Sequence, residues 1–188
     1  MHECAARALL HGTQSSVHLH LPSGSSVCRT QLALVADDKA AHLYDLASGK
    51  RTDCLHGHLD WGFAAAWHPG GNLLATGNQD CTTRLWDTRQ TRESIAVLPA
   101  SVGAVRSCRF SSDGKFLAVA EPIDFVHVYD VEGGLCAHQT IDFFGEISGI
   151  SFTPEGEALM VGVPDQDYTS TLCFLREDLH DKRCQETG

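Results

Sequence analysis

Apolar and polar residues alternate along most of the chain, and short polar turns interrupt the alternation at regular distances. A period of two is typical of strands with a buried face, whereas Pro and Gly mark the turns between strands. The clearest stretch predicts strands over 63–67, 72–77, 82–87 and 94–98, with a turn at His68-Pro69-Gly70-Gly71. The sequence therefore predicts an all-β chain whose basic unit is four short strands.

Three further units repeat this pattern. The predicted strands cover 17–21, 32–35, 41–45 and 50–55 in the first unit, 104–110, 115–120, 125–130 and 135–141 in the third, and 147–152, 158–163 and 171–175 in the fourth. We expect the units to occupy residues 15–56, 57–99, 100–142 and 143–176, between an N-terminal tail of residues 1–14 and a C-terminal tail of residues 177–188.

An aromatic residue followed by Asp closes the third strand of three units. These pairs, Tyr44-Asp45, Trp86-Asp87 and Tyr129-Asp130, lie 42 and 43 residues apart. A repeat of about 40 to 45 residues with this ending is typical of WD40 repeats, so the chain resembles the WD40 family of β-propellers. Closed propellers have about 4 to 8 blades. Three arrangements therefore stay open: part of a larger propeller, a half-propeller that self-associates through its open blade edges, or a ring of four blades.

The second unit also resembles the WD40 consensus at a hydrogen-bonded tetrad. His58, Thr76, Asp80 and Trp86 stand where that family links the strands of a blade through His, Ser or Thr, Asp and Trp. The other units depart from this consensus: the first has Tyr44 for Trp, the third has Ser101 for His, and the last has Phe174-Leu175 for Trp-Asp. We expect those units to rely on packing alone.

A narrower resemblance covers residues 31 to 176. The runs Gly57-His58-Leu59-Asp60-Trp61, Ala75-Thr76-Gly77-Asn78-Gln79-Asp80 and Ile141-Asp142-Phe143-Phe144-Gly145-Glu146-Ile147 are similar to an uncharacterised family of WD-repeat proteins from plants, algae and fungi. That resemblance implies the fold and no established activity.

The net charge of −10 is concentrated in the second half of the chain. Residues 95–188 hold 15 acidic and 6 basic residues. Binding to nucleic acid draws on clustered Lys and Arg, so we expect no direct nucleic-acid partner. An acidic surface favours a basic protein partner, or serves solubility alone.

The eight cysteines form no C-x-x-C motif. Several lie within predicted strands among apolar residues, which favours free thiols in a reducing compartment over a disulfide framework. No apolar run reaches the length of a membrane span or of a signal-peptide core. We therefore expect a cytoplasmic or nuclear protein with no membrane partner.

Metal and catalytic chemistry find little support in the sequence. The eleven histidines include His18 and His20 on one strand, but no further ligands stand at zinc-site spacing. Motifs for acyl or phosphoryl transfer are absent. We predict no metal, no cofactor and no enzyme activity, with a propeller enzyme of dispersed site as an alternative.

The turns on one face of the propeller are the predicted binding site. Large aromatic residues beside acids are typical of interface hot spots. The predicted partner-binding residues are Trp61, Asp124, Phe125, Phe144, Glu146 and Tyr168. The partner would be a protein or peptide, and the alternative is that the aromatic residues pack between blades.

A short motif indicates a more specific partner. The segment that ends at Trp86-Asp87-Thr88-Arg89 resembles the WDxR box of substrate receptors in cullin-RING ubiquitin ligases. That resemblance implies that Arg89 contacts the ligase adaptor, since a guanidinium can donate two parallel hydrogen bonds. The alternative is a local ion pair between Arg89 and Asp87.

Overall fold

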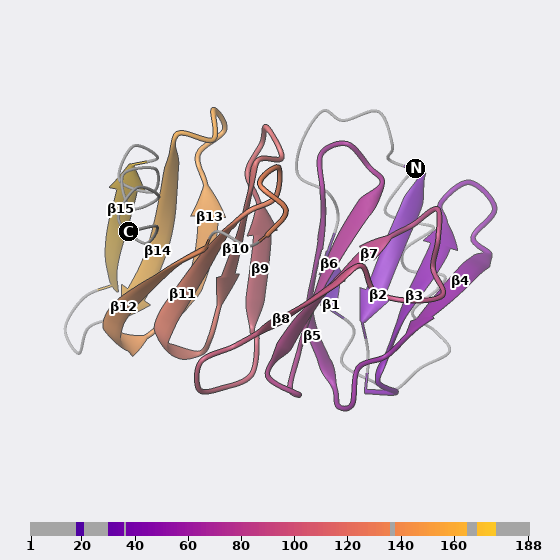
Figure 1. Ribbon diagram of the computed structural model, residues 1–188, viewed down its shortest axis with the longest axis horizontal. Helices are drawn as coiled ribbons and strands as arrows, with labels where there is room; N and C mark the ends of the chain where they lie inside the picture. Colours follow the sequence, from indigo (N-terminus) through magenta and orange to yellow (C-terminus); the bar gives the residue numbers. More distant parts are fainter. Residues whose placement is uncertain (1–17, 21–29, 36, 136–137, 165–168, 176–188) are drawn as a thin grey trace, which may run out of the picture.

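The computed structural model describes residues 18–20, 30–35, 37–135, 138–164 and 169–175, and the regular structure within these ranges is entirely β (Figure 1). Four antiparallel sheets follow one another along the chain. They are made of β1 (His18–His20), β2 (Gln31–Val35), β3 (Ala40–Asp45) and β4 (Arg51–His56); β5 (Gly62–Trp67), β6 (Leu73–Asn78), β7 (Thr82–Asp87) and β8 (Ala96–Pro99); β9 (Ser107–Phe110), β10 (Phe116–Ala120), β11 (Ile123–Asp130) and β12 (His138–Glu146); and β13 (Gly149–Phe152), β14 (Ala158–Pro164) and β15 (Thr169–Leu175).

The sheets stand in a row, in chain order. Strand β5 packs against β1 and β2 on one side and against β9 on the other, and β9 packs in turn against β13. Figure 1 places the first sheet and the fourth sheet at opposite ends of this row. Four consecutive antiparallel sheets that meet through their first strands are the arrangement of a partial propeller, which confirms the predicted fold class.

Three apolar layers between neighbouring sheets form the core. Leu74 and Trp86 of the second sheet pack toward the first sheet, whereas Ala75 and Leu85 pack toward the third. Successive side chains on a strand point to opposite faces, so a strand between two sheets needs apolar residues at every position. This explains the uninterrupted apolar run of Phe116–Ala120, all of which is buried.

The strands lie where the alternation predicted them, apart from small shifts at their ends and one larger difference. Residues 123–124 and 142–146 were expected outside the strands, but they extend β11 and β12. Ile123 pairs with Glu146 and Phe125 pairs with Asp142, with a register shift between them. Strand β11 thus begins two residues earlier, and β12 ends five residues later, than the sequence indicated.

Candidate partner-binding face

The predicted tetrad is present in the second sheet. Nδ1 of His58 lies 2.9 Å from Oδ2 of Asp80, and its Nε2 lies 2.8 Å from Oγ1 of Thr76. A carboxylate only accepts hydrogen bonds, so Nδ1 donates to Asp80 and Nε2 accepts from Thr76. Trp86 completes the tetrad by donating from Nε1 to Oγ1 of Thr76 at 2.8 Å. The tetrad thereby connects the segment before β5 to strands β6 and β7.

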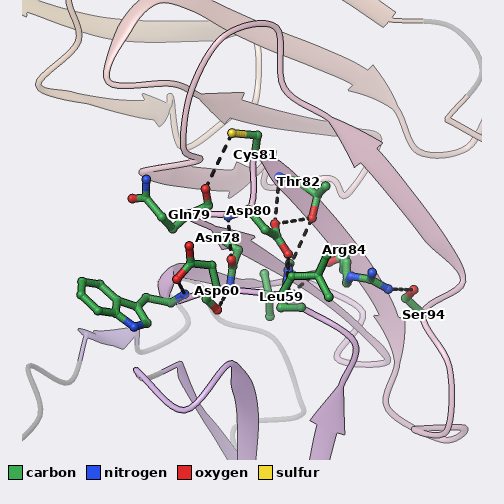
Figure 2. A network of polar contacts seen from close by, with 12 residues as sticks. Leu59, Asp60, Asn78, Gln79, Asp80, Cys81, Thr82, Arg84 and Ser94 are labelled. Carbon is green, nitrogen blue, oxygen red and sulfur yellow. Dashed lines mark hydrogen bonds and ion pairs between the residues drawn. The ribbon is translucent and has the colours of Figure 1, made fainter.

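Asp80 also fixes the connection between the first two sheets. Its carboxylate accepts from the backbone N–H groups of Leu59 and Thr82 at 2.9 and 3.0 Å, as Figure 2 shows. Burial would raise the pKa of Asp80, but these hydrogen bonds and those from Thr82 and His58 outweigh it and lower the pKa. Burial lowers the pKa of His58 against the opposing effect of Asp80. The pair therefore consists of a neutral imidazole and a carboxylate.

The third sheet has a buried polar network of its own, so the expectation that it relies on packing alone was wrong. Oε1 of Glu121 accepts from Nε2 of His127 at 2.9 Å and from the backbone N–H of Ser101 at 2.6 Å. Oε2 accepts from the N–H groups of Val102 and Gly103 at 2.9 and 2.7 Å. Sequence comparison with the tetrad missed this network because it uses Glu121 and His127 at other positions of the repeat.

The first sheet carries a related set, which also corrects that expectation. His42 of β3 lies 2.7 Å from Asp38 through Nε2 and 3.4 Å from Cys54 through Nδ1. His42 and His127 occupy the same position on the third strand of their sheets, 85 residues apart. That regularity is the signal in the sequence that could have revealed both networks.

Two of the predicted face residues are strongly exposed aromatic side chains. Trp61 is 53% exposed and Phe144 is 88% exposed. Trp61 lies in the connection between β4 and β5, where its carbonyl accepts from the N–H of Gln79 at 2.9 Å and where Asn78 donates to the carbonyl of Asp60 at 2.7 Å. The backbone under Trp61 is therefore anchored to the turn between β6 and β7.

The register shift at the end of β12 presents Phe144. Between the pairs Ile123–Glu146 and Phe125–Asp142, one residue of β11 lies opposite three residues of β12. Both Asp124 and Phe144 adopt left-handed backbone conformations with φ of 66° and 50°. Bulges of this kind redirect side chains out of a sheet. Phe144 is thereby turned to solvent, although its neighbour Phe143 packs against the core between the third and fourth sheets.

The remaining predicted face residues differ in their placement. Glu146 is exposed at the end of β12, and Asp124 is half-buried near the start of β11, opposite it. Phe125 is also half-buried, and its ring stacks on His127 with centroids 6.4 Å apart. The structure therefore brings Asp124, Phe144 and Glu146 to one end of the third sheet. Tyr168 lies outside the described residues.

Sequence analysis missed three exposed apolar residues at the same end of the sheets. Leu59 is 74% exposed, Val102 is 76% exposed and Ile123 is 57% exposed. Because the strands are antiparallel, the connections that hold Leu59 and Val102 lie at the end where β11 begins and β12 ends, along the lower edge of Figure 1. We name Leu59, Trp61, Val102, Ile123 and Phe144 the apolar rim. Apolar residues inside predicted turns were the available signal.

Acidic side chains accompany the apolar rim. Asp60 precedes Trp61, Asp124 follows Ile123, and the exposed carboxylates of Asp142 and Glu146 flank Phe144. Arg106, in the connection before β9, is an exposed cation that lies over the ring of Phe63 at 3.8 Å from the centroid. Contiguous exposed apolar groups beside one sign of charge mark interaction surfaces.

Arg89 forms a local ion pair with Asp87. Nε and Nη2 of Arg89 donate to the two carboxylate oxygens at 2.9 and 2.6 Å, and the backbone N–H of Arg89 donates to the same carboxylate. The side-chain hydrogen bond from Arg89 is the main reason why the pKa of Asp87 falls to about 2. The guanidinium is 69% exposed, but two of its nitrogens are already engaged.

Within the described residues, no group of three or more His, Cys, Asp or Glu side chains is arranged to hold a metal ion. In the same part of the chain, no helix has the length and apolar character that crossing a membrane requires.

Comparison with protein-family models finds two matches. The model described as WD domain, G-beta repeat (WD40) matches residues 49–87, which include the tetrad. A model described as an uncharacterised protein domain (DUF2415) matches residues 103–142, which include the Glu121 network.

Known relatives share repeats with this chain. The chain is 31% identical over 105 residues to Pre-mRNA-processing factor 19 of Oryza sativa subsp. japonica, which is 54% of this chain and 19% of that protein. It is 23% identical over 166 residues to the Guanine nucleotide-binding protein subunit beta of the same plant, covering 80% of this chain and 42% of that protein. It is 30% identical over 154 residues to WD repeat-containing protein 1 of Gallus gallus, covering 77% of this chain and 22% of that protein.

The row of antiparallel sheets and the tetrad define a repeat protein of the propeller class. The family model and the relatives make it specific: this chain belongs to the WD40-repeat proteins. The chain spans less than half the length of each of these three relatives.

Proposed function

We propose that this chain is a non-catalytic interaction scaffold that binds a protein or peptide partner through the apolar rim and its acidic neighbours. The observation that carries the proposal is that five large apolar side chains, each more than half exposed, project from one end of the second and third sheets. Rigid strands and buried networks hold their backbone, so little ordering entropy is lost on binding. The WD40 family supports an interaction role in general.

The chemistry of the rim favours a partner segment with apolar side chains beside Lys or Arg. Asp142 and Glu146 flank Phe144 along β12, Asp124 lies on the paired end of β11, and the chain carries a net charge of −10. Opposite charges would speed the encounter, and burial of the aromatic rings would supply most of the affinity. We place this activity in the cytoplasm or nucleus, consistent with free cysteines among the described residues.

A pair of matched variants tests this proposal. Phe144→Ser removes the most exposed ring of the rim, whereas Ile95→Ser changes an exposed residue before β8, on the outer edge of the second sheet. Partners that co-purify with the unchanged chain should be lost with Phe144→Ser and kept with Ile95→Ser, while both variants melt like the parent. Equal recovery of partners with both variants would place the binding surface elsewhere.

The cullin-RING substrate receptor remains the second candidate. It is supported by the Trp86-Asp87-Thr88-Arg89 segment and by the exposure of Arg89, and weakened by the ion pair with Asp87. Arg89→Ala distinguishes the two: loss of a ligase adaptor from the folded variant would support receptor function, and unchanged recovery would leave Arg89 with its local role.

Self-association through open blade edges would appear as a concentration-dependent mass in sedimentation.

A further inference from the structure

Three side chains of the first sheet form a hydrogen-bonded series that ends on a thiol. Cys54 on β4 is the register partner of His42 on β3, and Asp38 lies in the turn before β3. Sγ of Cys54 is 3.4 Å from Nδ1 of His42, and Nε2 of His42 is 2.7 Å from Oδ2 of Asp38. A thiol, an imidazole and a carboxylate are thus connected in that order.

The carboxylate determines where the imidazole proton lies. Asp38 can only accept, so Nε2 of His42 carries the hydrogen and donates it. Nδ1 then presents its lone pair to the S–H group of Cys54. A nucleophile next to a base that a third group orients is the arrangement that activates Ser and Cys side chains.

We propose that Cys54, His42 and Asp38 form a reactive-thiol site that takes soft carbon electrophiles, with His42 as the base. In the reaction with iodoacetamide, a new S–C bond forms and the C–I bond breaks, with its electron pair leaving on iodide. The thiol proton passes to Nδ1 of His42. The carboxylate of Asp38 stabilises the imidazolium that results.

The third sheet shows what distinguishes this site from a structural link. His127 makes the equivalent contacts, 3.0 Å to Oγ1 of Thr140 and 2.9 Å to Glu121. There the side chains of His127 and Glu121 are only 4% and 1% exposed, whereas those of His42 and Asp38 are 14% and 57% exposed. The first sheet therefore combines a half-buried thiol in place of a hydroxyl with a more exposed imidazole and carboxylate.

Burial keeps the Cys54 thiol protonated at rest. It is the main reason why the pKa of this thiol is raised; Arg51 lowers the pKa, and Asp38 and Asp53 raise it. A base must therefore remove the proton as the new bond forms, which is the role of His42. A thiolate of higher pKa is also the stronger nucleophile once it forms.

The test is the rate of alkylation of each cysteine by iodoacetamide, measured by peptide mass spectrometry after timed quenching of the folded chain. Cys81 is the internal control, because it is also half-buried but its Sγ lies 3.7 Å from the carbonyl of Gln79, and no imidazole of the described residues hydrogen-bonds to it. Cys54 should react faster than Cys81. His42→Asn should slow Cys54 on the order of 10²-fold, the lower end of what a positioned base contributes, and leave Cys81 unchanged.

Two more variants keep the test decisive. His56→Asn changes an exposed histidine on the same edge strand and should leave the rate at Cys54 unchanged. Asp38→Asn alters an exposed carboxylate, so the fold should survive even if His42→Asn melts early, and the rate should fall several-fold. The proposal would be overturned if Cys54 reacted no faster than Cys81. It would also be overturned if Cys54 reacted as fast in Asp38→Asn and in folded His42→Asn as in the unchanged chain.

Discussion

Nε2 of His127 donates to Oε1 of Glu121 over 2.9 Å, and both side chains are almost fully buried. The same carboxylate accepts from three consecutive backbone N–H groups, those of Ser101, Val102 and Gly103. Burial would raise the pKa of Glu121, but its hydrogen bonds outweigh burial and lower the pKa. One buried carboxylate thus fixes the connection that presents Val102 at the apolar rim.

Glu121→Ala should destabilise the chain strongly. The change leaves His127 and three backbone N–H groups without their acceptor, and removal of one partner from a buried pair costs about 3–5 kcal/mol. The free energy of unfolding, measured in urea, is the readout. Glu132→Ala, at an exposed position in the turn after β11, should leave it nearly unchanged. Similar stabilities of the two variants would contradict the role given to Glu121.

Two buried threonines on neighbouring strands should respond in opposite ways to the same substitution. Oγ1 of Thr76 bonds to both His58 and Trp86, so Thr76→Val should cost about 1–3 kcal/mol. Oγ1 of Thr83 is fully buried and has no hydrogen-bond partner within the described part of the chain. Thr83→Val should therefore stabilise the fold, by up to about 1–3 kcal/mol. Thermal denaturation checks both, and a loss of stability in Thr83→Val would indicate a partner for that hydroxyl.

The stability of the chain should fall as the pH decreases below about 6.5. Burial lowers the pKa of His58 in the folded state below its ordinary value of about 6.5, so the unfolded chain binds more protons in this range. The contribution of His58 is complete above pH 6.5 and is lost as the pH falls through its folded pKa. Urea unfolding at pH 7.5, 6.5 and 5.5 should show the decline, and His58→Asn should flatten it. An unchanged slope in that variant would assign the effect to other histidines.

Gly114 and Gly134 provide a matched test of a turn. Both have positive φ, 77° and 78°, but a Cβ on Gly114 would lie 2.3 Å from Nε2 of His68, whereas one on Gly134 meets nothing within 4 Å. Gly134→Ala should cost only the free energy of holding a residue with a Cβ in the left-handed backbone conformation, about 1–2 kcal/mol. Gly114→Ala should cost more, since it also displaces the His68 ring from the Gly114 carbonyl, 3.1 Å away. Equal melting temperatures would mean that His68 moves freely.

The pattern of alternation predicted the strands well because most strands turn apolar side chains toward a neighbouring sheet and end at polar turns. It failed at residues 123–124 and 142–146, where two strands continue through a register shift. No local signal marks such a shift, since it depends on which residues oppose each other across the pair. The apolar rim was predicted only in part: Trp61 and Phe144 were named from their residue types, whereas Leu59, Val102 and Ile123 were missed as ordinary apolar residues.

The sequence by itself determined the repeat, the strand order and the tetrad of His58, Thr76, Asp80 and Trp86, because each depends on residues at fixed distances along the chain. Only the tertiary structure decided which polar groups form hydrogen bonds with each other and which apolar side chains are exposed to solvent. Glu121 reaches Ser101–Gly103 across 18 to 20 residues, and Cys54 meets His42 across a strand pair. Such contacts arise from register and burial, which no short stretch of sequence specifies.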